Sequence, residues 1–172
     1  MRDLVKRMER ALGEENKVTL ETLNTFGTVL KDNGQYEEAI KIFERCLVGQ
    51  MKVLGEDHKD TLDMLNKMGA AYYGLMNYEK ALKYFERALN GGEKTMGKNH
   101  LETLTTVINI ANVYTMGMRN YGNAEELYEA QLGKDHQRTK MCAMNFRICL
   151  ERNSNSERLT ALISSYPWLT NE

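Results

Sequence analysis

The sequence predicts an all-α fold made of stacked helical hairpins, and three observations carry this prediction. A segment that begins at residue 12 returns at residue 54 and again at residue 96, which gives a period of 42 residues. Aligning residues 12–53 with residues 54–95 gives 19 identical positions of 42. Within each copy, apolar residues recur at the spacing of one face of an α-helix. Repeats of this length bury their apolar faces by stacking on their neighbours.

Each repeat is expected to be a helix, a short turn and a second helix. In the first repeat, one apolar stripe runs from Leu20 to Leu30 and a second from Tyr36 to Leu47. Asn33-Gly34-Gln35 separates the stripes and is typical of a turn. Small residues recur where the two helices must approach closely, and aromatic residues recur where they can fill the space between helices. We therefore predict a core that includes Gly27, Gly69, Ala111, Ala39, Ala81, Ala124, Phe43, Phe85 and Tyr128.

We expect residues 1–172 to form a single repeat domain. Its parts are the end of a preceding helix at 1–12, repeats at 13–54 and 55–96, a shortened repeat at 97–132, and a C-terminal helix pair with a cap at 133–172. The array therefore begins in the middle of a repeat. Either a longer protein continues before residue 1, or Met1 starts a chain whose first helix caps the stack.

The third repeat departs from the period. Its linking segment comes 36 residues after the previous one, which indicates one residue added near Arg119-Asn120 and seven lost from the second helix. Seven residues are about two helical turns, so the helical phase changes little. The last helix pair is predicted at 138–151 and 156–165, with Ser154 or Ser156 as the N-cap of its second helix.

The residues Gly27, Gly34, Tyr36, Ala39 and Phe43 carry a family resemblance. Their spacing resembles the tetratricopeptide repeat, which is normally about 34 residues long. The longer period and the linking segment at 54–62 are similar to the variety found in kinesin light chains. The resemblance implies a right-handed solenoid of three to four helix pairs and no catalytic activity. It also implies a protein-interaction module or adaptor that holds a peptide or helix of a partner in a concave groove.

The same resemblance implies which residues line the groove. They are expected on the first helix of each pair, at positions i, i+4 and i+7. An asparagine suits such a surface because its amide offers both donors and an acceptor to a peptide backbone. The alternative is that these residues form solvated polar faces only. The predicted groove residues are Asn24, Thr28, Lys31, Asn66, Tyr73, Ile108, Asn112, Thr115, Met144 and Ile148.

Charge and composition narrow the class of partner. Lys plus Arg number 23 and Asp plus Glu number 24, so the basic excess needed to bind a phosphate backbone is missing. The sequence has no apolar run of the roughly 20 residues that span a bilayer and no signal-peptide core near its start. We therefore predict protein or peptide partners, without nucleic acid or membrane, and an intracellular, cytoplasmic location.

Few residues suggest catalysis or metal binding. His58, His100 and His136 all lie in linking segments. Successive helix pairs are about 8–10 Å apart, whereas zinc needs nitrogen ligands at about 2 Å, so these histidines cannot share an ion. Cys142 with His136 is the best nucleophile and base pair, but it lacks a second stabilising donor. The sequence has no phosphate-binding loop motif. We expect no enzyme activity, no metal and no cofactor.

The C-terminus carries an apolar segment after the last helix. Leu159, Leu162 and Tyr166 lie on one helical face, Pro167 turns the chain, and Trp168 and Leu169 follow. We expect Tyr166, Trp168 and Leu169 to cap the last helix pair, because an end repeat must shield its core from water. The alternative is an anchor that inserts into a partner. A second functional hypothesis follows: a structural subunit packed into a larger assembly through its edges and end caps.

Overall fold

The computed structural model describes residues 2–117, 121–152 and 155–170. These residues form α-helices with one π-helical turn, one 3-10 turn and no strand, which confirms the all-α prediction. The elements are α1 (Arg2–Leu12), α2 (Lys17–Asp32), α3 (Tyr36–Leu54), α4 (Lys59–Gly74), α5 (Tyr78–Thr95), α6 (Leu101–Asn112), η1 (Val113–Gly117), α7 (Tyr121–Leu132), α8 (Gln137–Arg152), α9 (Ser156–Ser165) and η2 (Pro167–Thr170). The chain divides into two compact units, Met1–Thr106 and Val107–Glu172.

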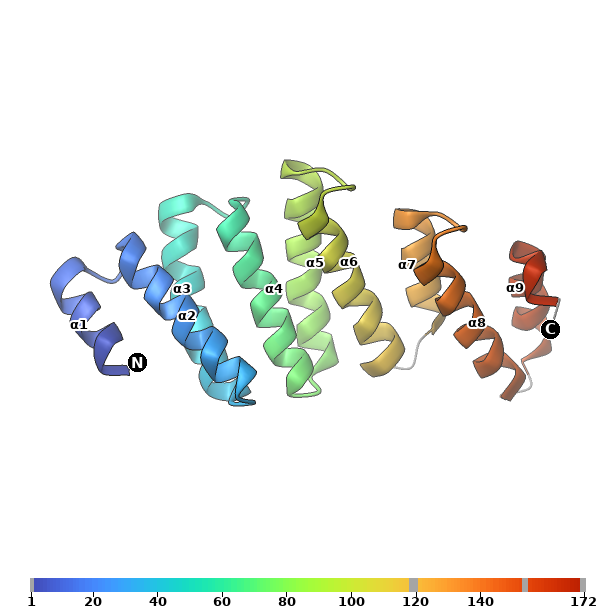
Figure 1. Cartoon of the computed structure of the whole chain (residues 1–172), viewed down its shortest axis with the longest axis horizontal. Coiled ribbons are helices and arrows are strands. Elements are labelled where there is room, and N and C mark those ends of the chain that lie inside the picture. The colour runs from blue at the N-terminus through green and yellow to red at the C-terminus, as the bar shows by residue number, and fades with distance from the viewer. Residues whose placement is uncertain (1, 118–120, 153–154, 171–172) are drawn as a thin grey trace. The chain divides into compact units, whose positions relative to one another are not determined.

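Unit 1 contains two complete hairpins, α2 with α3 and α4 with α5, preceded by α1 (Figure 1). The pairing of a glycine with a phenylalanine sets the distance between the helices of each hairpin. A Cβ atom on Gly27 would lie 2.4 Å from Cε1 of Phe43, and one on Gly69 would lie 2.6 Å from Cε1 of Phe85. Both phenylalanines are buried. The predicted close approach is therefore confirmed in both repeats.

A second set of glycines serves the same purpose in a place that the sequence did not reveal. A Cβ atom on Gly49 would lie 2.5 Å from Cδ2 of Leu20, and one on Gly91 would lie 2.4 Å from Cδ2 of Leu62. Glycine lowers helix propensity, which alone would disfavour it in the long second helices. Here it lets the leucine at the start of each first helix pack directly against the backbone.

In each linking segment, the residue directly before the helix caps that helix. The Oδ1 atom of Asn16 accepts a hydrogen bond of 2.9 Å from the Val18 N–H. The Nδ1 atom of His58 accepts one of 3.2 Å from the Asp60 N–H, and His100 and His136 make the same bond at 3.3 and 3.2 Å. The three histidines are thus N-caps, a position in which Ser, Thr, Asp and Asn are preferred.

Unit 2 begins within α6 and is less regular. Helix α7 has 12 residues whereas α3 has 19, so it is seven residues shorter. The residue predicted to be added near Arg119 and Asn120 lies outside the described part of the chain. Immediately before it, α6 widens into the π-helical turn η1, and such a turn accommodates one extra residue in a helix.

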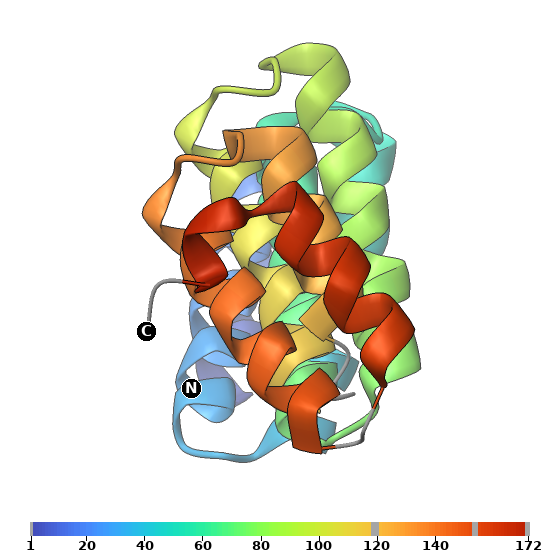
Figure 2. The ribbon, with the colours of Figure 1, turned by 90° about the vertical axis from the view of Figure 1, so that its right-hand side faces the viewer.

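The last hairpin, α8 with α9, carries an apolar cluster of unit 2, and Figure 2 shows these two helices side by side. The predicted serine N-cap of α9 is wrong. Asn155 is the N-cap, and its Oδ1 accepts a 3.2 Å hydrogen bond from the Arg158 N–H, while Ser156 is the first helical residue. Asn and Ser are similarly good N-caps, so the sequence could not fix the boundary. The cluster consists of Ala143, Leu150, Leu162, Tyr166 and Leu169, with Phe146, Leu159, Ile163 and Trp168 packed against it.

Among the described residues, no helix combines the length and the apolar character that crossing a membrane requires.

Candidate protein-binding surface

In unit 1, the predicted groove residues lie on the first helices, α2 and α4, and a lysine connects the two. The Nζ atom of Lys67 donates a hydrogen bond of 2.9 Å to Oδ1 of Asn24 and one of 2.6 Å to Oδ2 of Asp63. Lys67 was not among the residues predicted for this surface. The structure therefore shows Asn24 already engaged by an ammonium group of its own chain.

Asn66 stands one repeat further on and has a different environment. Its Nδ2 donates a hydrogen bond of 2.9 Å to Oγ1 of Thr106. Its Oδ1 is shielded from solvent and accepts no hydrogen bond from any described residue. An unsatisfied buried acceptor costs about 1–3 kcal/mol, so this oxygen lowers the stability of the fold unless a water molecule reaches it.

The other predicted residues of unit 1 are half-buried and have partners in their own repeat. The hydroxyl of Thr28 donates to the Asn24 carbonyl at 2.9 Å, and Nζ of Lys31 lies 2.6 Å from Oδ1 of Asp32. The ring of Tyr73 contacts the ring of Tyr78 with centroids 5.7 Å apart. This part of the surface is polar, apart from the tyrosine rings.

In unit 2, the predicted residues are more apolar. Met144 and Ile148 on α8 are 38% and 41% exposed, and Met141 is 58% exposed on the same helical face. Ile108 is half-buried on α6. Asn112 and Thr115 line a hollow of about 440 Å³ together with Met141, Asn145 and Arg138. The two units thus present different chemistry at equivalent repeat positions.

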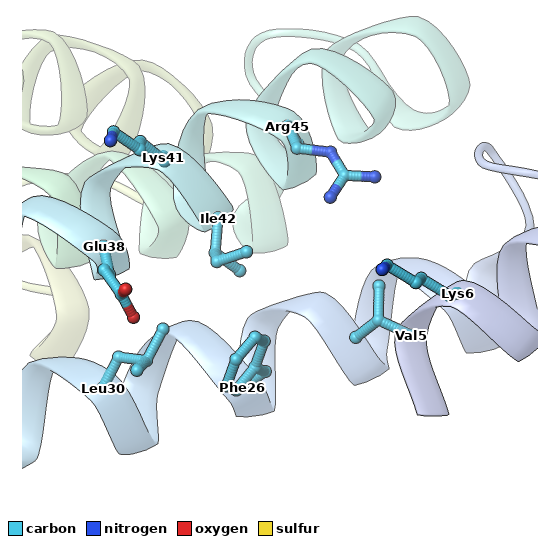
Figure 3. Close-up of a pocket in the computed structure, with 8 residues that line it drawn as sticks. All are labelled: Val5, Lys6, Phe26, Leu30, Glu38, Lys41, Ile42 and Arg45. Atoms are coloured by element: carbon cyan, nitrogen blue, oxygen red, sulfur yellow. The ribbon is translucent and has the colours of Figure 1, made fainter. Parts of the chain in front are cut away.

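A separate hollow of about 280 Å³ lies between α1, α2 and α3 (Figure 3). Its apolar lining comes from Val5, Phe26, Leu30 and Ile42. Charged residues complete the lining: Lys6, Glu38, Lys41 and Arg45. None of the predicted groove residues contributes to this hollow.

The C-terminal segment folds onto unit 2. Tyr166 is 1% exposed, and its hydroxyl lies within hydrogen-bond distance of the carboxyl groups of Glu125 and Glu129, the latter at 2.6 Å; its single proton is donated to one of them at a time. Burial raises the pKa of Glu125, and the bond from Tyr166 lowers the pKa of Glu129. The Trp168 ring lies edge-on to the Tyr166 ring, with centroids 6.0 Å apart.

The described cysteine and histidine side chains that could act in catalysis or metal binding are buried or used in hydrogen bonds within the fold. Burial raises the pKa of Cys142 to about 11 and that of Cys46 to about 12, which disfavours the reactive thiolate. The Sγ atom of Cys46 donates to the Leu20 carbonyl at 3.2 Å. Nδ1 of His136 is used in helix capping. In the part of the chain that the structure describes, no three metal-ligating side chains come together.

The position of the partner-binding surface stays a prediction, and the polar connections between its residues were not part of that prediction. Lys67 and Asp63 are four residues apart, which places them on one face of α4. That spacing is visible in the sequence. The bond from Lys67 to Asn24 is not, because it depends on how α2 and α4 pack.

Comparisons with known proteins agree with this fold. The Tetratricopeptide repeat family model matches residues 18–90 and 60–132. No curated protein sequence matches the chain. Two structures of a kinesin light chain-type protein with nearly identical TPR-like repeats from Podosopora anserina, one of them a single-residue variant, superpose with TM-scores of 0.71 and 0.70. They are 18% and 19% identical, and the matches cover 98% of this chain and 83% and 82% of theirs.

BtubC (BKLC) from P. vanneervenii is also similar, with a TM-score of 0.69 and 13% identity, over 99% of this chain and 70% of that one. At these identities the structures establish the fold. The family model covers more than half of the sequence and supports a role in protein–protein interaction. The chain belongs to the tetratricopeptide repeat family, and its fold is that of the kinesin light chain-like repeats.

Proposed function

We propose that this chain is an adaptor that holds a peptide or helix of a partner protein against the first helices of its repeats, with no chemistry of its own. The observation that carries the proposal is the set of half-buried polar side chains on the first helices of unit 1, which keep part of their surface accessible to a partner: Asn24, Thr28, Lys31 and Asn66.

The remaining groove residues support a partner of mixed character. Asn24, Lys31 and Asn66 favour hydrogen bonds to a peptide in unit 1, whereas exposed Met144 and Ile148 favour apolar side chains in unit 2. Methionine adapts its shape to different partners. Buried, uncharged thiols at Cys46 and Cys142 are consistent with the cytoplasmic location that we propose.

The test is affinity capture from a native extract with the intact chain as bait and identification of the bound protein by mass spectrometry. Asn66→Ala and Tyr73→Ala should each weaken binding of that protein by about 1–2 kcal/mol, as loss of a buried hydrogen bond or an aromatic contact does. Lys83→Ala, on the exposed side of α5, is the matched control and should bind normally. Thermal unfolding of all three variants separates a binding defect from misfolding.

The second candidate function, a subunit packed into a larger assembly, is favoured by the N-terminal edge of unit 1. Leu4 and Leu12 on α1 are 41% and 46% exposed, and Val5 and Lys6 of the same helix line the hollow of Figure 3. If Leu4→Ser or Ile42→Ser abolishes capture while Asn66→Ala and Tyr73→Ala leave it unchanged, the edge is the interface. The groove proposal would then be wrong.

A further inference from the structure

The hollow between α1, α2 and α3 has a counterpart in the next repeat, where the chain supplies two aromatic rings. Leu30 on α2 and Ile42 on α3 line the hollow. One period later, the sequence has Tyr72 and Tyr84 at these two positions. Their rings stack, with centroids 5.3 Å apart and planes 11° apart. The second repeat thus has a pair of rings where the first repeat has two aliphatic side chains beside an open space.

The later repeats also have aromatic residues here. The third repeat has Tyr114 at the position of Leu30. In the last hairpin, Leu150 and Leu162 stand at the positions of the aliphatic pair, and both belong to one buried cluster with Tyr166 of the C-terminal segment. An aromatic residue at or against this pair of positions is therefore a feature that the first repeat does not share.

The hollow is open to solvent and large enough for a ring. Its volume is about 280 Å³, whereas a cavity of about 150 Å³ is enough to hold benzene. Figure 3 shows Phe26 and Leu30 pointing from α2, and Ile42 pointing toward them from α3. Phe26 and Leu30 are 7% and 6% exposed and form the floor, while Ile42 is half-buried. An entering ring can therefore reach Ile42 from solvent and cover the floor.

The shortness of α1 leaves room for a helix beside the hollow. Helix α1 has 11 residues, whereas α3, its counterpart in the next repeat, has 19. The first turn of α3 packs on the end of α4, since a Cβ atom on Gly74 would lie 2.4 Å from Cζ of Tyr36. Figure 1 shows that α1 lies beside only part of α2. The next repeat thus shows that a helix packs on this part of the hairpin.

The charges at the rim of the hollow favour an aromatic ring over a cationic side chain. The rim carries three cationic side chains and one carboxylate: Lys6, Lys41, Arg45 and Glu38. An excess of positive charge repels a further cation, whereas an ammonium is attracted to the electron-rich face of a ring. The second repeat contains such a contact, because Nζ of Lys80 lies 5.2 Å from the centroid of the Tyr72 ring.

We propose that this hollow is a second docking site, which receives an aromatic side chain from a helix of a partner protein. The ring packs against Phe26, Leu30 and Ile42, as the tyrosine rings of the second repeat pack against each other. The helix that carries the ring lies along α2 beyond the end of α1. No predicted groove residue lines the hollow, so this site goes beyond the groove and does not depend on it.

The test is an NMR titration of the intact chain, isotope-labelled at its methyl groups, with p-cresol as the probe. This compound reproduces a tyrosine side chain. The matched control is 4-methylcyclohexanol, which keeps the size and the hydroxyl without the aromatic ring. The methyl signals of Val5, Leu30 and Ile42 should shift with p-cresol. The control should bind about two- to fivefold more weakly, because it cannot make a cation–π contact.

Leu30→Tyr combined with Ile42→Tyr copies the ring pair of the second repeat into the first. The added rings should fill the hollow and abolish p-cresol binding without lowering the thermal midpoint. Ile42→Tyr alone is the second variant, should the double variant fail to fold, and it should weaken p-cresol binding severalfold. Val29→Tyr adds a tyrosine at an exposed position of α2 outside the hollow, and it should bind p-cresol normally.

The partner itself is tested by capture from a native extract. An excess of p-cresol should release the captured protein, 4-methylcyclohexanol should not, and the double variant should fail to capture it. Equal affinity for the two probes, unshifted methyl signals, or unchanged p-cresol binding by the tyrosine variants would overturn the proposal. A partner that stays bound in p-cresol and to the double variant, but is lost with Asn66→Ala, would reject this site and keep the groove.

Discussion

In unit 1, the first helix of each hairpin has a glycine opposite a phenylalanine of the second helix, Gly27 with Phe43 and Gly69 with Phe85. At the same repeat positions, the last hairpin of unit 2 has Arg147 and Ile163. Both partners have changed together. Arg147 donates from Nε to Glu151 at 2.7 Å and from Nη1 to the Leu169 carbonyl at 2.5 Å.

The difference shows two ways of completing a hairpin. A glycine and an aromatic ring bring two helices close together, and the next hairpin in unit 1 repeats the contact. In the last hairpin, the side chain at the glycine position reaches the chain beyond α9 and binds it. Tyr166, which is buried, holds the same segment through Glu125 and Glu129. We infer that the last hairpin is closed by its own C-terminal residues.

The largest effect is expected at the regular pair. Phe85→Ala should lower the free energy of unfolding by about 3–5 kcal/mol, because it opens a cavity beside Gly69. Ile163→Ala in the last hairpin should cost less, because Ile163 is only partly buried and has no glycine opposite it. Urea unfolding of both variants provides the measurement. Equal losses would mean that the two hairpins are packed alike.

The regular pair is also the part of the fold that the sequence predicts best. Gly27, Phe43, Gly69 and Phe85 recur with the period, so internal comparison alone identifies them as core. Gly49 and Gly91 recur too, but their contacts with the leucines of the first helices depend on the packing of long helices. The histidine caps were missed because histidine is not a preferred N-cap residue.

For the candidate surface, the sequence predicts on which helix each residue lies but not which groups it contacts. Asn24 and Asn66 are indistinguishable in the alignment, yet one binds Lys67 and the other has an unsatisfied oxygen. The hydrogen-bond network of Tyr166, Glu125 and Glu129 joins residues that are far apart in the sequence. No local sequence pattern predicts such a contact.

The second-largest loss of stability is expected at Arg147, the arginine at the repeat position of Gly27 and Gly69. Arg147→Met keeps most of the apolar stem but removes the bonds to Glu151 and the Leu169 carbonyl. Hydrogen bonds to charged groups contribute about 1.5–3 kcal/mol, and we expect a loss of unfolding free energy in that range. Chemical denaturation measures it. Unchanged stability would mean that Arg147 does not hold the C-terminal segment.

A smaller effect is expected at the linking segments, which are alike in both units. His58→Ala should destabilise the protein by about 1 kcal/mol through loss of the N-cap bond, whereas His58→Asn should restore it, as Asn16 does in the first repeat. The measurement is the shift of the thermal midpoint for each variant. If Ala and Asn are equivalent at this position, the cap contributes nothing to stability.

The smallest effect is a dependence of stability on pH between acid and neutral, which we expect from two carboxyl groups of unit 2. The pKa of Glu125 is raised above 4.5 by burial and by Glu129 and Glu126, against the lowering effect of Tyr166. The native state therefore holds more protons than the unfolded state above pH 4.5, and this group makes stability fall as pH rises from there through the raised pKa. Glu125→Gln should remove that fall.

The contribution of Glu129 has the opposite sign. Its pKa is lowered, chiefly by the Tyr166 bond, so its contribution to stability is lost as pH falls below about 4.5. Glu125→Gln should leave that acid loss in place. Denaturant unfolding of wild type and variant at a series of pH values from acid to neutral gives the slope of the unfolding free energy against pH for each protein. A wild-type curve parallel to that of the variant would contradict the assignment to Glu125.

The C-terminal segment closes the last hairpin, and Trp168, the only tryptophan of the chain, reports directly on this contact. The measurement is its fluorescence in the intact protein, with iodide as quencher. Trp168 packs against the cluster of Leu162, Tyr166 and Leu169, so we predict emission at shorter wavelength than free indole in water and weak quenching. Emission like that of free indole, with full quenching by iodide, would show an exposed anchor and contradict the cap.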